Sequence, residues 1–233
     1  MNNASTVQPV AAYERDVAYR ERAAGMYSAV PWALALQVAE LPYVFVQTVL
    51  YTAIIYSAMG FEPSAPKIFW FALVEMLTLL AFTFYGQLAV ALTPHVQLAA
   101  VVSSFFYSFF NLFAGFLIPV PVRPGWRDLP RHAPLTRPIA AQSMPWWWRW
   151  YAYLDPVQWT VYGLVASQLG DVYDGCVRAM PDAPCASPAA FVRHRFGYRH
   201  EFLGGVVGIL AAFCIVFTAV AAIAHAALNF QRR

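Results

Sequence analysis

The chain has 233 residues, of which 60% are hydrophobic and only 12% charged. Soluble domains carry about 25% charged residues, so this composition excludes an ordinary soluble protein and indicates a membrane protein. The formal net charge is +3, and the sequence contains no basic run dense enough for a nucleic-acid surface. We therefore expect one all-α, polytopic membrane domain. Its expected partner is membrane lipid, and we expect no nucleic-acid partner.

Residues 1–30 form the first segment, in which Tyr13-Glu14-Arg15-Asp16 and Tyr19-Arg20-Glu21-Arg22 mix charges with aromatic rings. This pattern favours an amphipathic helix at the membrane interface, and a solvated charged segment is the alternative. The polar start of the chain runs into these charges without an apolar core, so we expect no cleavable signal peptide.

Three transmembrane helices are predicted within residues 31–118, at about 32–59, 68–92 and 96–118. A bilayer core about 30 Å thick is crossed by about 20 helical residues, so the last two segments are too long together for one crossing. The break at Thr93-Pro94-His95 is therefore a turn at one membrane face.

Two acidic residues fall inside these predicted spans. Glu40 lies in the first third of the first span, and Glu75 lies two turns into the second. An acid within a span indicates a functional residue, although one near a span end can lie at the lipid headgroups. The second reading suits Glu40, and both acids remain candidate proton sites.

The third span carries a stripe of small and polar residues at helical spacing, namely Ser104, Ser108, Asn111 and Gly115. Such a stripe on a Phe-rich helix faces protein or a water-filled cavity rather than lipid. Either helix packing or a substrate path explains it.

Residues 119–202 form a large loop, expected on the extracytoplasmic side. Its segment 122–143 is rich in Pro and Arg and predicts irregular structure. Residues 145–169 contain a Trp-rich run and a short apolar helix, which predict a re-entrant or interfacial helical hairpin bending at Asp155-Pro156. Cys176 and Cys185 can pair as a disulfide there or remain thiols.

The last predicted transmembrane helix and a basic tail occupy residues 203–233. Four spans place both termini on one side, and the terminal arginines favour the cytoplasm. The chain contains no phosphate-binding loop, and Lys67 is its only lysine, so we expect no ATPase site, no catalytic residue and no metal site in this chain.

Several motifs in order along the chain resemble the C-terminal membrane domain of plant subfamily G ABC transporters of the pleiotropic drug resistance type. They are Tyr19-Arg20-Glu21-Arg22-Ala23-Ala24-Gly25-Met26-Tyr27-Ser28, Glu40-Leu41-Pro42-Tyr43, Phe82-Thr83-Phe84-Tyr85-Gly86, Ala89-Val90-Ala91-Leu92-Thr93-Pro94, Asn111-Leu112-Phe113-Ala114-Gly115-Phe116, Pro156-Val157-Gln158-Trp159-Thr160-Val161-Tyr162-Gly163-Leu164 and Asn229-Phe230-Gln231-Arg232-Arg233.

This resemblance implies that the four spans are the third to sixth helices of a second membrane domain. It implies partners as well: nucleotide-binding domains that bind ATP and Mg, another membrane domain, and a small apolar substrate. By position, the residues coupling to a nucleotide-binding domain would be Glu14, Arg15, Tyr19, Arg20, Glu21 and Arg22. The substrate path would be lined by Ser104, Ser108 and Asn111, with Phe116 and Leu117 as an outer plug.

The function expected from this resemblance is export of amphipathic or apolar compounds across the plasma membrane. Glu75 and the segment 122–143 depart from the family pattern, so the resemblance does not decide whether this chain supports transport. Two alternatives follow from the residues: a truncated, non-transporting partner of full-length relatives, or an ion-coupled carrier that uses Glu40 and Glu75.

Overall fold

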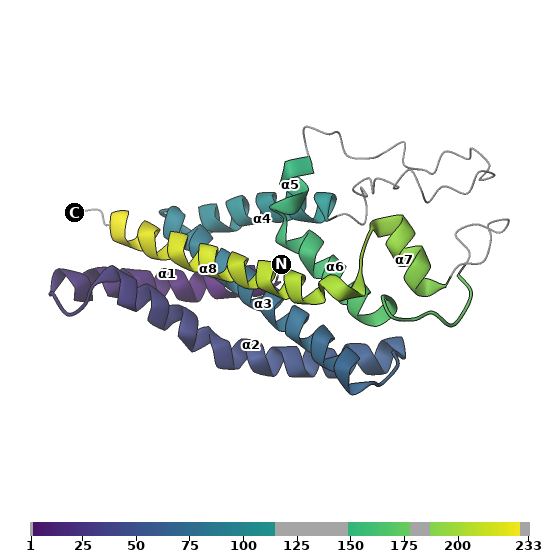
Figure 1. The fold of residues 1–233 in the computed structure, drawn as a ribbon. Coiled ribbons are helices and arrows are strands. Elements are labelled where there is room, and N and C mark those ends of the chain that lie inside the picture. The colour runs from purple at the N-terminus through teal and green to yellow at the C-terminus, as the bar shows by residue number, and fades with distance from the viewer. Residues whose placement is uncertain (1, 115–148, 178–186, 229–233) are drawn as a thin grey trace. The chain divides into compact units, whose positions relative to one another are not determined.

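The computed structural model describes residues 2–114, 149–177 and 187–228, and its regular elements in these ranges are helices. The predicted all-α class is confirmed. The elements, shown in Figure 1, are α1 (Asn2–Ala23), α2 (Ala29–Met59), α3 (Ala65–Leu92), α4 (Val96–Phe113), α5 (Arg149–Tyr153), α6 (Pro156–Leu169), α7 (Pro188–Phe196), a 3-10 turn (His200–Phe202) and α8 (Leu203–Ala227).

Four helical segments in the described ranges are long and apolar enough to cross a membrane, and each overlaps one predicted span. They are α2, α3, α4 and the continuous helical segment His200–Ala227. The turn between α3 and α4 falls at Thr93-Pro94-His95, as predicted. The predicted irregular segment 122–143 lies outside the described residues.

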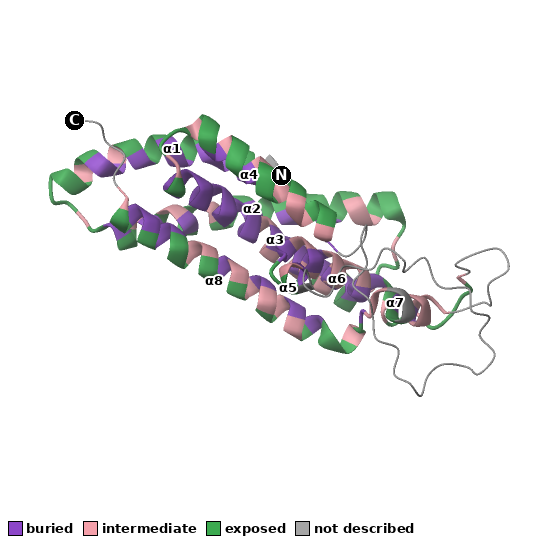
Figure 2. Ribbon diagram, turned by 90° about the horizontal axis from the view of Figure 1, so that it is seen from above, coloured by how far each residue is buried: buried purple, intermediate pink, exposed green. Residues whose placement is uncertain are grey.

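The chain divides into two compact units, residues 1–109 with 207–233, and residues 110–206. In the first unit α3 is the central helix, since every residue from Leu80 to Ala91 is buried (Figure 2). One face of α3 packs with α1 and α4 through a cluster of small side chains: Ala11, Ala12, Ala89, Val90 and Ala99. Another packs with α2 and α8 through Val44, Leu80, Ala81, Phe84 and Cys214.

Small residues let α1 approach α3 closely. A Cβ atom added to Gly86 would lie 2.5 Å from the carbonyl oxygen of Ala4 and 2.9 Å from its Cα. Only glycine fits at this crossing, because backbone atoms of α1 occupy the space of a side chain. Small residues have this role in membrane helix contacts generally. The first half of α1 therefore packs along α3, whereas the sequence predicted a helix at the membrane interface.

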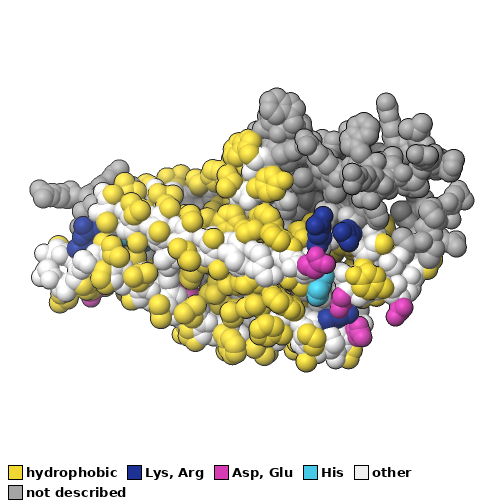
Figure 3. Space-filling model, viewed as in Figure 1, with side chains coloured by type: hydrophobic (Ala, Val, Ile, Leu, Met, Phe, Trp, Pro, Cys, Tyr) yellow, Lys and Arg dark blue, Asp and Glu magenta, His cyan; other side chains and the backbone are white. Residues whose placement is uncertain are grey.

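The outer surfaces of the long helices carry large apolar side chains (Figure 3). On α2, Val38, Phe45 and Ile54 are 61%, 59% and 63% exposed. In water, apolar patches of this extent mark sites of association. On a helix of spanning length they match the hydrocarbon of a bilayer, where exposed leucine, valine and phenylalanine cost nothing.

The second unit is built around α6. The side chain of Asp155 caps this helix by accepting a hydrogen bond from the backbone N–H of Val157 at 2.8 Å. The break between α5 and α6 therefore falls where the sequence placed the bend. Tyr162 of α6 accepts a hydrogen bond from the backbone N–H of Arg199 at 2.8 Å, and His200 contacts the carbonyl of Ala166 at 3.1 Å. Helix α7 was not predicted.

Candidate functional site

The guanidinium of Arg15 holds the end of α3. Its two terminal nitrogens donate to the carbonyl oxygens of Val90 at 2.6 Å, Thr93 at 2.6 Å and Pro94 at 3.0 Å. The last carbonyls of a helix have no partner within it, and a cation there also complements the helix dipole. Because Arg15 is only 4% exposed, α1 satisfies the C-terminus of α3 from inside the protein.

Two further side chains of α1 hold the end of α8. The hydroxyl of Tyr19 donates to the carbonyl of Leu228 at 3.3 Å. Arg22 donates to the carbonyls of His225 at 3.0 Å and Ala226 at 3.4 Å. We call Arg15, Tyr19 and Arg22 the α1 clamp, because together they join one helix to the C-terminal ends of two others.

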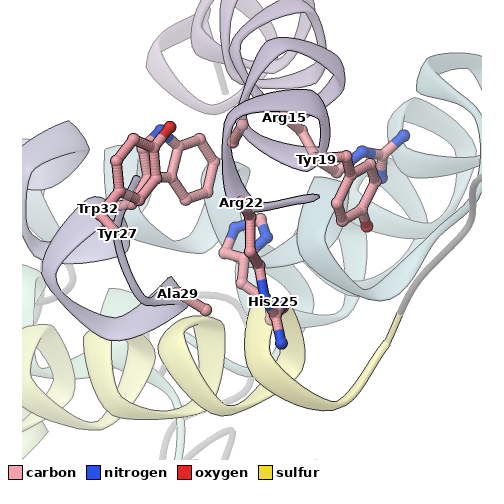
Figure 4. Close-up of a pocket in the computed structure, with 8 residues that line it drawn as sticks. Arg15, Tyr19, Arg22, Tyr27, Ala29, Trp32 and His225 are labelled. Carbon is pink, nitrogen blue, oxygen red and sulfur yellow. The ribbon is translucent and has the colours of Figure 1, made fainter. Parts of the chain in front are cut away.

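The clamp lies beside Tyr27, Trp32 and His225, which Figure 4 shows with it. Trp32 meets the ring of His225 edge to face, with ring centres 4.8 Å apart. The pocket lined by the clamp, Tyr27, Trp32 and His225 has a volume of about 10 Å³. That is room for at most a single water, so the side chains here leave no space for a larger ligand.

The other predicted coupling residues remain on the outside of α1. Glu14 and Arg20 are exposed, as is Asp16 between them. Glu21 is half-buried and accepts a hydrogen bond from the Tyr27 hydroxyl, which raises the pKa of Tyr27 to about 12. The six residues that the resemblance grouped together therefore divide: Arg15 and Tyr19 are buried, Glu21 is half-buried, and Glu14, Arg20 and Arg22 are exposed, although Arg22 still bonds the end of α8.

The first half of α1 makes polar contacts at the depth of the spans. Gln8 is 1% exposed and donates to the hydroxyl of Ser103 at 2.8 Å, while Tyr85 donates to the Ser103 carbonyl at 3.0 Å. Asn3 and Gln47 exchange two amide hydrogen bonds of 3.0 and 2.8 Å. Sequence reasoning missed these contacts, because a lone glutamine or serine in an apolar stretch does not reveal its partner.

The predicted stripe on α4 lies on the open side of that helix. Ser104 is half-buried, whereas Ser108 and Asn111 are exposed, and Ser108 donates to the backbone carbonyl of Ser104 at 2.9 Å. The face of α4 that packs inside this chain instead carries Ala99 and Ser103. The buried face of α4 therefore differs from the face that carries Ser104 and Ser108.

Four predicted residues fall outside the described part of the chain: Gly115, Phe116, Leu117 and Cys185. Cys176 is disulfide-bonded, and its pairing with Cys185 stays a prediction. Cys214 is a free, buried thiol that packs in the core of the first unit. In the described ranges no cluster of three or more His, Cys, Asp or Glu side chains could hold a metal ion.

Asp155 is the most completely buried carboxylate in the described residues, with an exposed fraction of 0%. One oxygen accepts from Val157, while the other oxygen is buried without a hydrogen-bond partner. Burial raises the pKa of Asp155 to about 7, against the smaller, opposite effect of the backbone N–H groups of Val157 and Gln158. The sequence pattern predicted only a bend of the chain at Asp155, without its burial or its missing hydrogen-bond partner.

Comparison with known proteins gives consistent matches along the whole chain. The ABC-2 type transporter family matches residues 1–141. Over 233 residues the chain is 46% identical to Pleiotropic drug resistance protein 1 of Nicotiana tabacum and 43% identical to ABC transporter G family member 36 of Arabidopsis thaliana. It is 48% identical over 230 residues to ABC transporter G family member 44 of Oryza sativa subsp. japonica.

These alignments cover 98–100% of this chain but only 14% of each of the three relatives. The matched family, the four candidate spans and the helical fold agree with one another. The chain therefore belongs to the ABC-2 type transporter family, as a membrane domain of the kind found in plant pleiotropic drug resistance transporters of subfamily G.

Proposed function

We propose that this chain is the membrane-spanning part of an exporter that moves amphipathic or apolar compounds when it is combined with nucleotide-binding domains. The observation that carries this proposal is the two-sided character of α1. Its inner face clamps the ends of α3 and α8, and its outer face presents Glu14, Asp16 and Arg20. A helix of this kind can receive a force on one face and pass it to two spans through the other.

The outer face of α1 is the proposed contact with a nucleotide-binding domain on the cytoplasmic side. Exposed charges of both signs suit docking on a polar protein surface, where charge pairs set orientation more than affinity. Movement of that domain would displace α1, and the hydrogen bonds of Arg15 and Arg22 would carry the displacement to the ends of α3 and α8. ATP and Mg would be bound by the nucleotide-binding domains and not by this chain.

The proposed substrate path lies along the open face of α4. Ser104, Ser108 and Asn111 supply sparse polar groups among exposed phenylalanines such as Phe105 at 57%. A mostly apolar surface with few polar groups discriminates weakly among apolar compounds. A second membrane domain would close the path on its other side, and Phe116 and Leu117 would form the outer plug. Alternating access would then be a shear between the two membrane domains.

The matched relatives are about seven times as long as this chain, so the test uses a chimera. This chain replaces the matching segment of the tobacco relative, and uptake of a fluorescent amphipath is measured in inside-out plasma-membrane vesicles. We expect uptake that requires ATP. Reversing both outer charges with Glu14→Lys and Arg20→Glu should abolish uptake while ATP hydrolysis continues. Glu201→Lys, a reversal of an exposed charge in the 3-10 turn before α8, is the matched control.

Two other outcomes identify the alternatives. Uptake that follows a proton gradient without ATP, and that is lost in Glu40→Gln or Glu75→Gln, would contradict ATP-driven export and favour an ion-coupled carrier. If the chimera fails to transport and the chain instead suppresses an intact relative on co-expression, the chain is a non-transporting interaction partner.

A further inference from the structure

A groove lies between α1 and α2 in the first unit, with a volume of about 380 Å³. Each helix contributes one face at the i, i+3, i+4, i+7 spacing of an α-helix. The α1 face consists of Asn3, Thr6, Val7 and Val10, the α2 face of Glu40, Tyr43, Val44 and Gln47, and Thr83 of α3 completes the lining. We call this the α1–α2 groove. Its volume falls in the range of small-molecule sites.

The groove contains an acid at membrane depth. Helix α2 has 31 residues and is therefore about 46 Å long, against about 30 Å of hydrocarbon. If α2 is centred in the bilayer, Glu40 lies about 8 Å inside the hydrocarbon boundary, because it is 11 residues after Ala29. At this depth the Glu40 carboxyl would lie below the lipid headgroups, in contact with the hydrocarbon region.

Glu40 has no cationic neighbour in the described ranges. Lys67 of the first unit pairs with Glu62 instead, and the groove lining contains no Arg, Lys or His. A carboxylate within a span is costly unless it is paired or hydrated. The half-buried Glu40 therefore favours the binding of a positively charged group in the groove.

The remaining lining selects the kind of cation. Val7, Val10, Val44 and the ring of Tyr43 supply apolar surface. Glu40 is the one acid in the lining, and the amides of Asn3 and Gln47 are hydrogen-bonded to each other, so the groove does not offer the several oxygen ligands that a metal ion needs. Val10 and Tyr43 are 54% and 73% exposed, so the groove is open along its side. An apolar chain can lie there while a charged head enters.

We propose that the α1–α2 groove binds an amphipathic primary amine, with the ammonium on Glu40 and the apolar chain between α1 and α2. This inference does not rest on export, since it concerns binding in the absence of ATP. The same ammonium chemistry occurs in free amphipathic amines and in the headgroup of phosphatidylethanolamine, and the test separates these two sources.

The test uses the full chain in phosphatidylcholine nanodiscs with dodecylamine that carries a photoreactive group in its alkyl chain. Saturable labelling is measured and mapped by peptide mass spectrometry. We expect labelling in α1 and α2, at least tenfold weaker for the matching neutral dodecanol. Glu40→Gln should weaken amine binding about tenfold, and Glu75→Gln, which removes the other acid within a span, should leave it unchanged.

A steric variant keeps the test decisive if Glu40→Gln fails to fold. Val10→Trp fills the groove but retains Glu40, and it should weaken amine binding by a similar factor. Val38→Trp places the same ring on a residue of α2 that does not line the groove, and it should have no effect.

Phosphatidylethanolamine added to the nanodiscs identifies the natural source of the amine. Competition with dodecylamine would support the proposal with a lipid headgroup as ligand, and the absence of competition would support it with a free amphipath as ligand. Equal labelling by the amine and the alcohol would overturn the proposal, as would amine binding that survives both Glu40→Gln and Val10→Trp.

Discussion

Replacing Arg15 with Met removes the clamp on α3 but keeps a long, apolar side chain. A hydrogen bond from a charged donor contributes about 1.5–3 kcal/mol to stability. Arg15 makes such bonds to the carbonyls of Val90, Thr93 and Pro94 at 2.6, 2.6 and 3.0 Å and is 4% exposed. Because bonds that share a donor group do not add fully, we expect a loss of about 4 kcal/mol in the free energy of unfolding.

Arg15→Lys retains the charge but not the planar fork of donors, so it should lose about 2 kcal/mol. The assay is reversible unfolding of the purified chain in mixed micelles, followed by circular dichroism. Arg20→Met is the control, since Arg20 is exposed on the same helix, and it should change stability by less than about 0.5 kcal/mol. A loss below about 1 kcal/mol for Arg15→Met would refute the reasoning.

Three further changes test other parts of the structure. Gly86→Ala should cost about 1–3 kcal/mol, because its Cβ would collide with Ala4, whereas Gly208→Ala, with nothing within 4 Å, should be neutral or stabilising in the same unfolding assay. Asp155→Asn should remove a pH dependence, because the folded pKa of about 7 lies above the unfolded value of 3.8. The wild type should therefore lose up to about 4 kcal/mol of stability as pH rises from about 4 to about 7, and equal pH profiles of the two proteins would contradict this. Gln8→Leu leaves the Ser103 hydroxyl without its donor and should cost about 1–2 kcal/mol by the same measurement, relieved in the double variant with Ser103→Ala.

The spans were predictable because the physics that fixes them is visible in composition. Lipid requires long apolar helices, so α2, α3, α4 and α8 follow from hydropathy. The bend before α6 follows from the Asp155-Pro156 pair, since proline suits the first position of a helix and aspartate its cap.

The clamp could not be predicted in the same way. Arg15 and Arg22 bind backbone carbonyls, and carbonyls are present at every residue, so the sequence contains no mark of the partner. The periodicity of α4 showed a polar stripe at Ser104, Ser108 and Asn111, but the buried hydrogen bond belongs to the adjacent Ser103. One position on a helix is 100° of rotation, and only the packing of α1 decides which serine is enclosed.

The expected position of α1 illustrates a further limit. Mixed charges and aromatic rings indicated an interfacial helix, and the second half of α1 has those features. The first half contains Ala4, Val7, Ala11 and Ala12, whose small size lets it enter the bundle against α3. A composition averaged over residues 1–30 conceals this change from a packed half to a charged half.

A distance between two spin labels tests most directly whether α1 moves as one body with the ends of the spans that it clamps. The labels are placed at Ala23 and Ala227, both exposed, in the chimera with a full-length relative. Pulsed electron paramagnetic resonance should give the same distance without nucleotide and with trapped ATP, and a distance that varies with nucleotide once Arg15 and Arg22 are replaced by Met. A change of several ångströms in the unsubstituted chimera would contradict the account.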